Sequence, residues 1–180
     1  MNELTTRCLD TFPEWLRSLG TDAAELSTLL EGDAVTNDAK KHVAAALNYL
    51  FKSLDLIPDG IEDLGFLDDA FVVRVAAKHA LAANGDLAKP EILVRLAEGA
   101  PLVEELLGAD YKRLVKYVEG LLHGAARGRT TEEIVSDASI REAFRTEVGG
   151  WAASYEPPSF SRDEKNIVKL ASFLTAKLPA

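Results

Sequence analysis

The chain of 180 residues contains one cysteine, Cys8. A single cysteine excludes an intrachain disulfide and any zinc site built from several thiolates. The lack of disulfides suits a reducing compartment. Cys8 shares a helical apolar stripe with Phe12 and Trp15, a setting typical of a small buried side chain rather than a reactive thiol.

Long apolar runs are also missing. No stretch reaches the roughly 18 uncharged apolar residues that a membrane-spanning helix needs. Residues 1–7 lack the basic and apolar regions of a secretion signal. We therefore expect a cytoplasmic protein without a transmembrane segment. The formal net charge of −9 further disfavours peripheral association with anionic membranes.

Positive charge is scarce, with 20 Lys and Arg against 29 Asp and Glu. Binding to nucleic acid requires clustered basic residues, and the one short cluster is Arg127-Gly128-Arg129. The chain also lacks a Gly-x-Ser-x-Gly nucleophile motif, a phosphate-binding loop and a dinucleotide fingerprint. The sequence thus predicts no nucleic-acid partner and offers no catalytic motif, which favours a protein that is not an enzyme.

Sustained alternation of apolar and polar residues is absent, and we therefore predict no strands. Apolar residues instead recur at spacings of three and four, the period of amphipathic helices. Hydrophobic residues make up 47% of the chain, enough for a substantial core. These patterns predict an all-α fold, a compact helical bundle of about seven to nine helices.

The predicted organisation is a helical core over residues 1–125 and C-terminal helices over residues 130–180 that pack on the same domain. Gly124 to Thr130, rich in Gly, Ala and Arg, is the predicted linker. Within the core, the first helix is expected to end at Gly20. Asp22 and Glu25 have the spacing of a capping box that would open a second helix.

The most unusual stretch is an acidic connection between two helical segments, Asp38 to Leu54 and Leu67 to Asn84. Pro58 biases Ile57 away from helical conformations, so the first helix is expected to end at about Asp55. The stretch holds six carboxylates: Asp55, Asp59, Glu62, Asp63, Asp68 and Asp69. We predict that this helix, acidic turn and helix form the centre of the fold.

Ordinary capping explains much of this acidity. Asp59 and Glu62 have capping-box spacing for a short helical turn over Gly60 to Leu64, which Gly65 would close with a positive φ. Asp68 and Asp69 fall in the first turn of the following helix, where the helix dipole stabilises carboxylates. In this interpretation the acids cap helix ends and hold the corner through hydrogen bonds.

The same stretch carries a family resemblance. Its motif runs Asp55-Leu56-Ile57-Pro58-Asp59, then Leu64-Gly65-Phe66-Leu67-Asp68-Asp69. This resembles the signature of the YkvA-like family, a domain of unknown function, over about residues 44–76. The family usually has prolines where this chain has Ser53 and Glu62, and their loss is expected to loosen the turn. The resemblance implies a helical fold and brings no established activity, cofactor or partner.

The alternative interpretation is a metal site. Asp55, Asp59, Asp68 and Asp69 offer the hard oxygen ligands that Mg²⁺, Mn²⁺ and Ca²⁺ prefer. The spacing does not follow the EF-hand loop, since Ile61 and Leu64 occupy positions that need an oxygen ligand and a glycine. His79 follows Asp68 by three helical turns, about 16 Å along the axis, and cannot join the same ion.

Two hypotheses follow for the function. The first is a non-enzymatic interaction or scaffold module with a structural acidic corner and no cofactor, which binds a protein partner or a second copy of itself. The alternative is a divalent-metal-dependent enzyme, hydrolase-like, that uses the Asp cluster. The candidate functional residues are Asp55, Pro58, Asp59, Gly65, Asp68 and Asp69.

Overall fold

The computed structural model describes residues 1–52 and 55–180 of the chain. These residues form nine α-helices, two one-turn 3₁₀ helices and one two-residue antiparallel strand pair, which confirms the predicted helical fold. The helices are α1 (Glu3–Thr28), α2 (Asn37–Tyr49), α3 (Leu67–Ala83), α4 (Glu91–Ala97), α5 (Ala100–Leu107), α6 (Tyr111–Gly120), α7 (Thr131–Ser136), α8 (Ala138–Ser154) and α9 (Glu164–Lys177). The 3₁₀ helices span Gly108–Asp110 and Leu121–His123.

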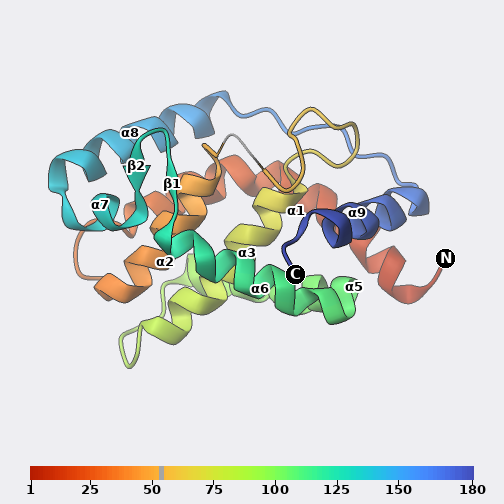
Figure 1. Ribbon diagram of the computed structural model, residues 1–180, viewed down its shortest axis with the longest axis horizontal. Helices are drawn as coiled ribbons and strands as arrows, with labels where there is room; N and C mark the ends of the chain where they lie inside the picture. Colours follow the sequence, from red (N-terminus) through yellow and green to blue (C-terminus); the bar gives the residue numbers. More distant parts are fainter. Residues whose placement is uncertain (53–54) are drawn as a thin grey trace.

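Helix α3 is the centre of the bundle (Figure 1). It is buried on nearly every side, as expected of a helix that is apolar all round rather than along one stripe. Helices α2 and α4 pack along it, and α1, α5 and α6 complete its surroundings. The acidic connection leads directly into this central helix, while the connection itself lies at the edge of the bundle (Figure 1).

Helix α1 continues through the predicted break at Gly20. A side chain at Gly20 would lie 3.1 Å from the ring of Tyr155 and 3.2 Å from the carbonyl of Ala152, so this glycine admits the close approach of α8 rather than ending the helix. Asp22 does not cap a new helix. It is buried and accepts hydrogen bonds from Ser18 and Arg95, each at 2.8 Å. The predicted break is therefore wrong.

The predicted linker at Gly124 to Thr130 is a small hairpin, and the prediction of no strands is wrong here. Strands β1 (Ala125–Ala126) and β2 (Arg129–Thr130) pair antiparallel. Arg127 and Gly128 form the two-residue turn with φ values of 49° and 76°, the positive values that a tight hairpin turn requires. The hairpin is too short to leave an alternation pattern in the sequence.

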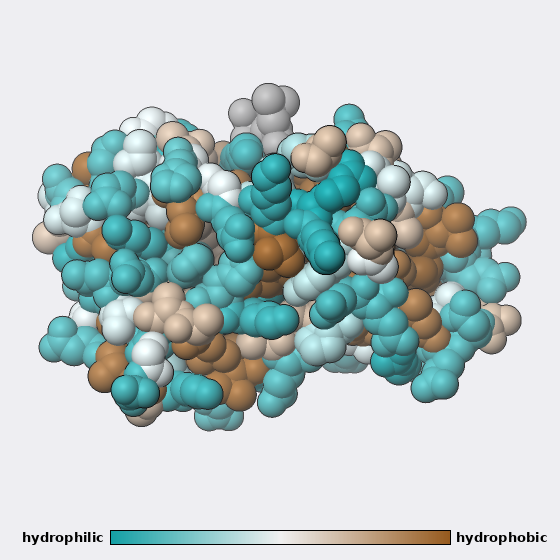
Figure 2. Space-filling model, turned by 60° about the horizontal axis from the view of Figure 1, so that its bottom comes forward, coloured by the Kyte–Doolittle hydropathy of each residue, from teal (hydrophilic) through white to brown (hydrophobic). Residues whose placement is uncertain are grey.

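The C-terminal helices pack on the rest of the chain. Helix α8 lies against α1, and α9 contacts α1 and α5 (Figure 1). Arg113 of α6 donates hydrogen bonds to the carbonyls of Thr175 and Pro179, each at 3.0 Å, and so holds the end of α9. None of the helices in the described ranges combines the length and apolarity that crossing a membrane requires. On the face in Figure 2, hydrophobic residues form separate small patches among hydrophilic ones.

Candidate metal centre

The acidic connection begins earlier than the sequence pattern predicts. Helix α2 ends at Tyr49 rather than near Asp55, while Ser53 and Leu54 of the predicted helix lie outside the described residues. The chain folds back over the end of α2, and the Leu56 N–H donates a 2.8 Å hydrogen bond to the Tyr49 hydroxyl. A continued helix would carry Leu56 away from Tyr49, so this return contact explains the early end.

Successive turns replace the predicted short helix over Gly60 to Leu64. The Ile61 N–H donates to the Pro58 carbonyl at 3.1 Å, and the Gly65 N–H donates to the Ile61 carbonyl at 2.9 Å. Asp59 and Glu62 make no capping-box hydrogen bonds among the contacts that the structure describes. Asp59 is therefore free of a capping role, and the turns carry its side chain toward the start of α3.

Gly65 is required for close packing rather than for a positive φ. A Cβ atom there would lie 3.0 Å from the Asp59 carbonyl carbon and 3.3 Å from the Ile61 carbonyl oxygen. The positive φ values of 65° fall instead on Asp63 and Phe66. Packing holds the Phe66 ring 5.3 Å from that of Tyr155, which offsets the cost of a left-handed bulky residue.

Asp68 draws the corner together. Its side chain is completely buried, and its Oδ2 accepts hydrogen bonds from the Tyr49 hydroxyl at 2.6 Å and from the Ile57 N–H at 3.2 Å. Because Tyr49 also accepts from the Leu56 N–H, one carboxylate oxygen links the end of α2, the connection and the start of α3. Asp68 thus acts across the corner and not only on its own helix.

Three carboxylates converge at this point. One oxygen from each of Asp59, Asp68 and Asp69 lies within 4.8 Å of the others. Two oxygens bound to a single Ca²⁺ at about 2.3–2.6 Å are at most about 5 Å apart, so the present spacing accommodates that ion. Mg²⁺ binds oxygens at about 2.0–2.1 Å, so two of its ligands are at most about 4.2 Å apart.

The buried oxygens at this cluster lack donors. Asp68 Oδ1, Asp69 Oδ2 and Asp55 Oδ1 are shielded from solvent and accept no hydrogen bond within the described part of the chain. Asp69 itself is only 2% exposed. A buried acceptor without a donor costs free energy, and native proteins rarely keep several together unless another group satisfies them. The donor set, all carboxylate oxygens, fits a hard cation.

The charges of the cluster are not balanced by basic residues. Within residues 1–52 and 55–180, no ion pair involves Asp55, Asp59, Asp68 or Asp69. Burial and the neighbouring carboxylates raise the pKa of Asp55 to about 7 and that of Asp59 to about 6. Burial and the other three acids raise the pKa of Asp69 well above its ordinary value. Without a cation, the folded protein therefore retains protons on this cluster.

Because the folded protein keeps these protons, removing one acid is expected to raise the free energy of unfolding by an amount that depends on pH. The unfolded chain releases the Asp69 proton near pH 4, whereas the folded protein keeps it to a much higher pH. The free energy of unfolding of the wild type therefore falls as the pH rises above about 4, and Asp69→Asn escapes this loss. In chelator, we expect Asp69→Asn to melt several degrees above the wild type at pH 8.

The difference in Tm between Asp69→Asn and the wild type should shrink toward zero near pH 4.5. Thermal melts of both proteins across this range provide the measurement. Burial lowers the pKa values of His42 and His79, which opposes the trend in each protein but cancels in their difference. A difference that is constant with pH, or that favours the wild type at pH 8, would contradict the raised pKa of Asp69.

Comparison with known proteins finds a similarity that includes the acidic corner. Residues 39–74 match the family model described as "Protein of unknown function (DUF1232)". This match includes the whole motif from Asp55 to Asp69 and confirms the family resemblance there. No curated protein and no solved structure matches the chain. The family description gives no activity.

The structure unites some predicted site residues and separates others. Asp59, Asp68 and Asp69 form the cluster, Asp55 lies close enough to raise the pKa of Asp69, and Pro58 and Gly65 shape the connection. The sequence did not single out Tyr49, because nothing in a helical stripe marks which hydroxyl reaches a distant carboxylate. It also did not indicate that His42 and His79 meet, although their rings contact each other with centroids 5.5 Å apart.

Proposed function

We propose that this protein is a non-enzymatic helical module that binds one hard divalent cation, Mg²⁺, Mn²⁺ or Ca²⁺, at its acidic corner. Asp59, Asp68 and Asp69 supply ligands, and Asp55 adds negative charge beside them. The observation that carries the proposal is a pair of buried oxygens, Asp68 Oδ1 and Asp69 Oδ2, which accept no hydrogen bond from the described residues and belong to a cluster with a third carboxylate, Asp59.

Protons alone satisfy this cluster poorly. Burial raises the pKa of Asp68 above its ordinary value, although the hydrogen bonds that its Oδ2 accepts from a hydroxyl and a backbone N–H favour the charged carboxylate. Above the pKa values of Asp55 and Asp59, about 7 and about 6, a proton on Asp69 still leaves these two carboxylates charged and without an ion pair in the described part of the chain. A divalent cation neutralises two charges at once and fills the position between the oxygens. Because its ligands come from the connection and from α3, the ion fixes the corner that joins α2 to α3.

The experiment is a thermal melt after chelator treatment, repeated with each ion. Binding to the folded state alone contributes about 2.7 kcal/mol at an ion concentration 100 times the dissociation constant. For a chain of this size, we expect Tm to rise by roughly 5–10 °C with the preferred ion. Asp69→Asn should abolish most of the rise, because its amide offers no charge to the ion.

Glu62→Gln is the matched control. Glu62 lies in the same connection, is exposed and is not part of the carboxylate cluster. Its variant should respond to the ion as the wild type does. If no ion raises Tm, or if both variants lose the response equally, the acidic corner is a purely structural element and the proposed function is wrong.

One observation favours a second candidate function, cation-dependent hydrolysis. Asp59 lines a groove that is open to solvent, so a cation held by this residue keeps coordination positions for water or substrate. Asp55, with a pKa of about 7, suits a general base at neutral pH. Ion-dependent hydrolytic activity that Asp55→Asn abolishes, while the ion still raises Tm, would replace the non-enzymatic proposal by this one.

A further inference from the structure

A groove of about 620 Å³ lies beside the acidic cluster, between the end of α2 and the β1–β2 hairpin. Its volume is in the range of small-molecule sites. Its lining combines four apolar residues with three charged side chains, and consists of Leu50, Phe51, Lys52, Asp59, Ala125, Ala126 and Arg127. Asp59 connects this groove to the proposed cation site.

The two cations of the groove are held in place. Lys52 Nζ lies 3.2 Å from the Tyr117 hydroxyl and 5.1 Å from the centre of its ring. The Arg127 guanidinium lies 4.9 Å from the centre of the Phe51 ring, and it also pairs with Glu147. Phe51 is itself buried, so the ring that supports Arg127 is fixed. These contacts therefore fix the positions of both charged groups.

These positive charges do not neutralise the adjacent acids. Neither Lys52 nor Arg127 forms an ion pair with the carboxylate cluster in the ranges that the structure describes. In a chain with a net charge of −9, two positioned cations next to unpaired carboxylates form a separated arrangement of opposite charges. An anion could contact the Lys52 and Arg127 side chains and also ligate a metal ion at Asp59, and so pair with positive charge on both sides of the groove.

We infer that this groove binds a small phosphate monoester, with one phosphoryl oxygen on the cation and the others on Lys52 and Arg127. The inference rests on the proposed cation site. A phosphate group fits because its dianion presents three oxygens in different directions, enough for three positive centres. Leu50 and Phe51 pack against the organic part. The source is a soluble ligand rather than a lipid headgroup, since the net negative charge repels an anionic bilayer.

The test uses phenylphosphonate, a non-hydrolysable phosphate-monoester analogue, and benzenesulfonate, which has a similar shape and one negative charge. Calorimetric titration at pH 8 with saturating cation should give a dissociation constant at least about tenfold lower for the phosphonate. Lys52→Ala and Arg127→Ala should each weaken phosphonate binding about tenfold or more, because each removes a charge-assisted contact. Removing the metal ion with a chelator should weaken phosphonate binding by a similar factor.

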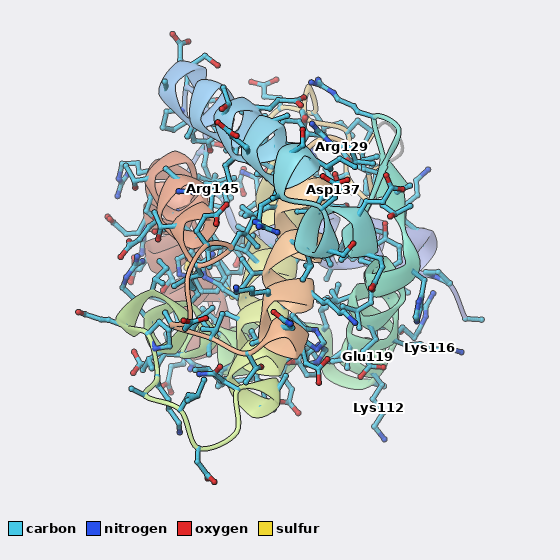
Figure 3. The ribbon with its side chains drawn as sticks, turned by 90° about the vertical axis from the view of Figure 1, so that its left-hand side faces the viewer. Lys112, Lys116, Glu119, Arg129, Asp137 and Arg145 are labelled. Carbon is cyan, nitrogen blue, oxygen red and sulfur yellow. The ribbon has the colours of Figure 1, made fainter. Side chains whose placement is uncertain are left out.

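Matched control variants exist for both cations. Lys112 projects from α6 away from the groove lining (Figure 3), so Lys112→Ala controls for Lys52→Ala. Arg17 pairs with an exposed glutamate and is 57% exposed, close to the 60% of Arg127, so Arg17→Ala controls for Arg127→Ala. Both controls should bind phosphonate as the wild type does. An ion-induced rise in Tm in every variant establishes that each is folded with its cation site intact.

The outcomes separate the two proposals. If the ion raises Tm but phosphonate does not bind, or binds no better than sulfonate, the ligand assignment is wrong and the cation site stands. If Lys112→Ala and Arg17→Ala lose as much phosphonate affinity as Lys52→Ala and Arg127→Ala, the assignment of the ligand to this groove is wrong. If no ion binds, the proposed function fails and this inference fails with it. Flotation of the protein with vesicles of phosphatidylcholine and phosphatidic acid would overturn the assignment to a soluble ligand.

Discussion

Gly65→Ala is expected to lower the free energy of unfolding by about 3 kcal/mol or more, the upper part of the range for overpacking. The added methyl group meets backbone atoms of Asp59 and Ile61, which cannot rotate away as a side chain does. Relief requires the connection to move away from α3 and to carry Asp59 out of the cluster. We therefore expect Tm to fall by roughly 6–12 °C in chelator, and the response to cation to be lost as well.

Gly60→Ala is the control for this prediction. Gly60 lies in the same connection, but a Cβ atom there meets no atom within 4 Å. Its variant should melt close to the wild type and keep the full response to the ion. Thermal melts of the two variants, with and without cation, make the comparison. A Gly65→Ala protein that melts and responds like Gly60→Ala would show that the close approach of Gly65 to Asp59 is not required.

Tyr49→Phe is expected to cost about 3 kcal/mol, because one hydroxyl serves two buried groups. Its loss leaves the Leu56 N–H without an acceptor and removes the shorter of the two hydrogen bonds to Asp68 Oδ2. Each unsatisfied buried group costs about 1–3 kcal/mol. The hydroxyl stays protonated in the wild type, since burial and the adjacent Asp68 raise the pKa of Tyr49 far above its ordinary value.

Tyr117→Phe provides the comparison, and chemical denaturation of both variants measures the two costs. The Tyr117 hydroxyl accepts one 3.2 Å hydrogen bond from Lys52 at a half-buried position, and its loss should cost less than 1 kcal/mol. We also expect Tyr49→Phe to bind the cation more weakly, because Asp68 is no longer held. Equal costs for the two tyrosines would contradict the role assigned to Tyr49 in the corner.

The sequence predicted the helices well where local signals mark their ends, and less well where a contact from a distant residue decides. Helix α3 was located within a residue, since its apolar pattern and Asn84 are local signals. The end of α2 was misplaced because it depends on the Tyr49 hydroxyl that receives the returning chain. Gly20 illustrates the same limit. From the local sequence, a glycine that leaves room for the Tyr155 ring cannot be distinguished from a glycine that ends a helix.

The candidate site was predicted by composition but not by arrangement. Carboxylate density singled out Asp55, Asp59, Asp68 and Asp69, yet spacing alone assigned Asp59 to a cap that it does not form. The sequence could not show which carboxylate oxygens are buried without a hydrogen-bond donor, because this depends on how the connection folds over α3. For the same reason the sequence left Lys52 and Arg127 apart, although the hairpin places both on the groove that Asp59 lines.

The most direct test of the cation site is a calorimetric titration of Ca²⁺ into chelator-treated protein at pH 7.5, in two buffers of different ionisation enthalpy. We expect one ion bound per chain with release of protons from the carboxylate cluster, since a ligand must lose its proton to bind the ion. Asp69→Asn should abolish both the binding and the proton release. Absence of binding in the wild type, or binding that Asp69→Asn leaves unchanged, would contradict it.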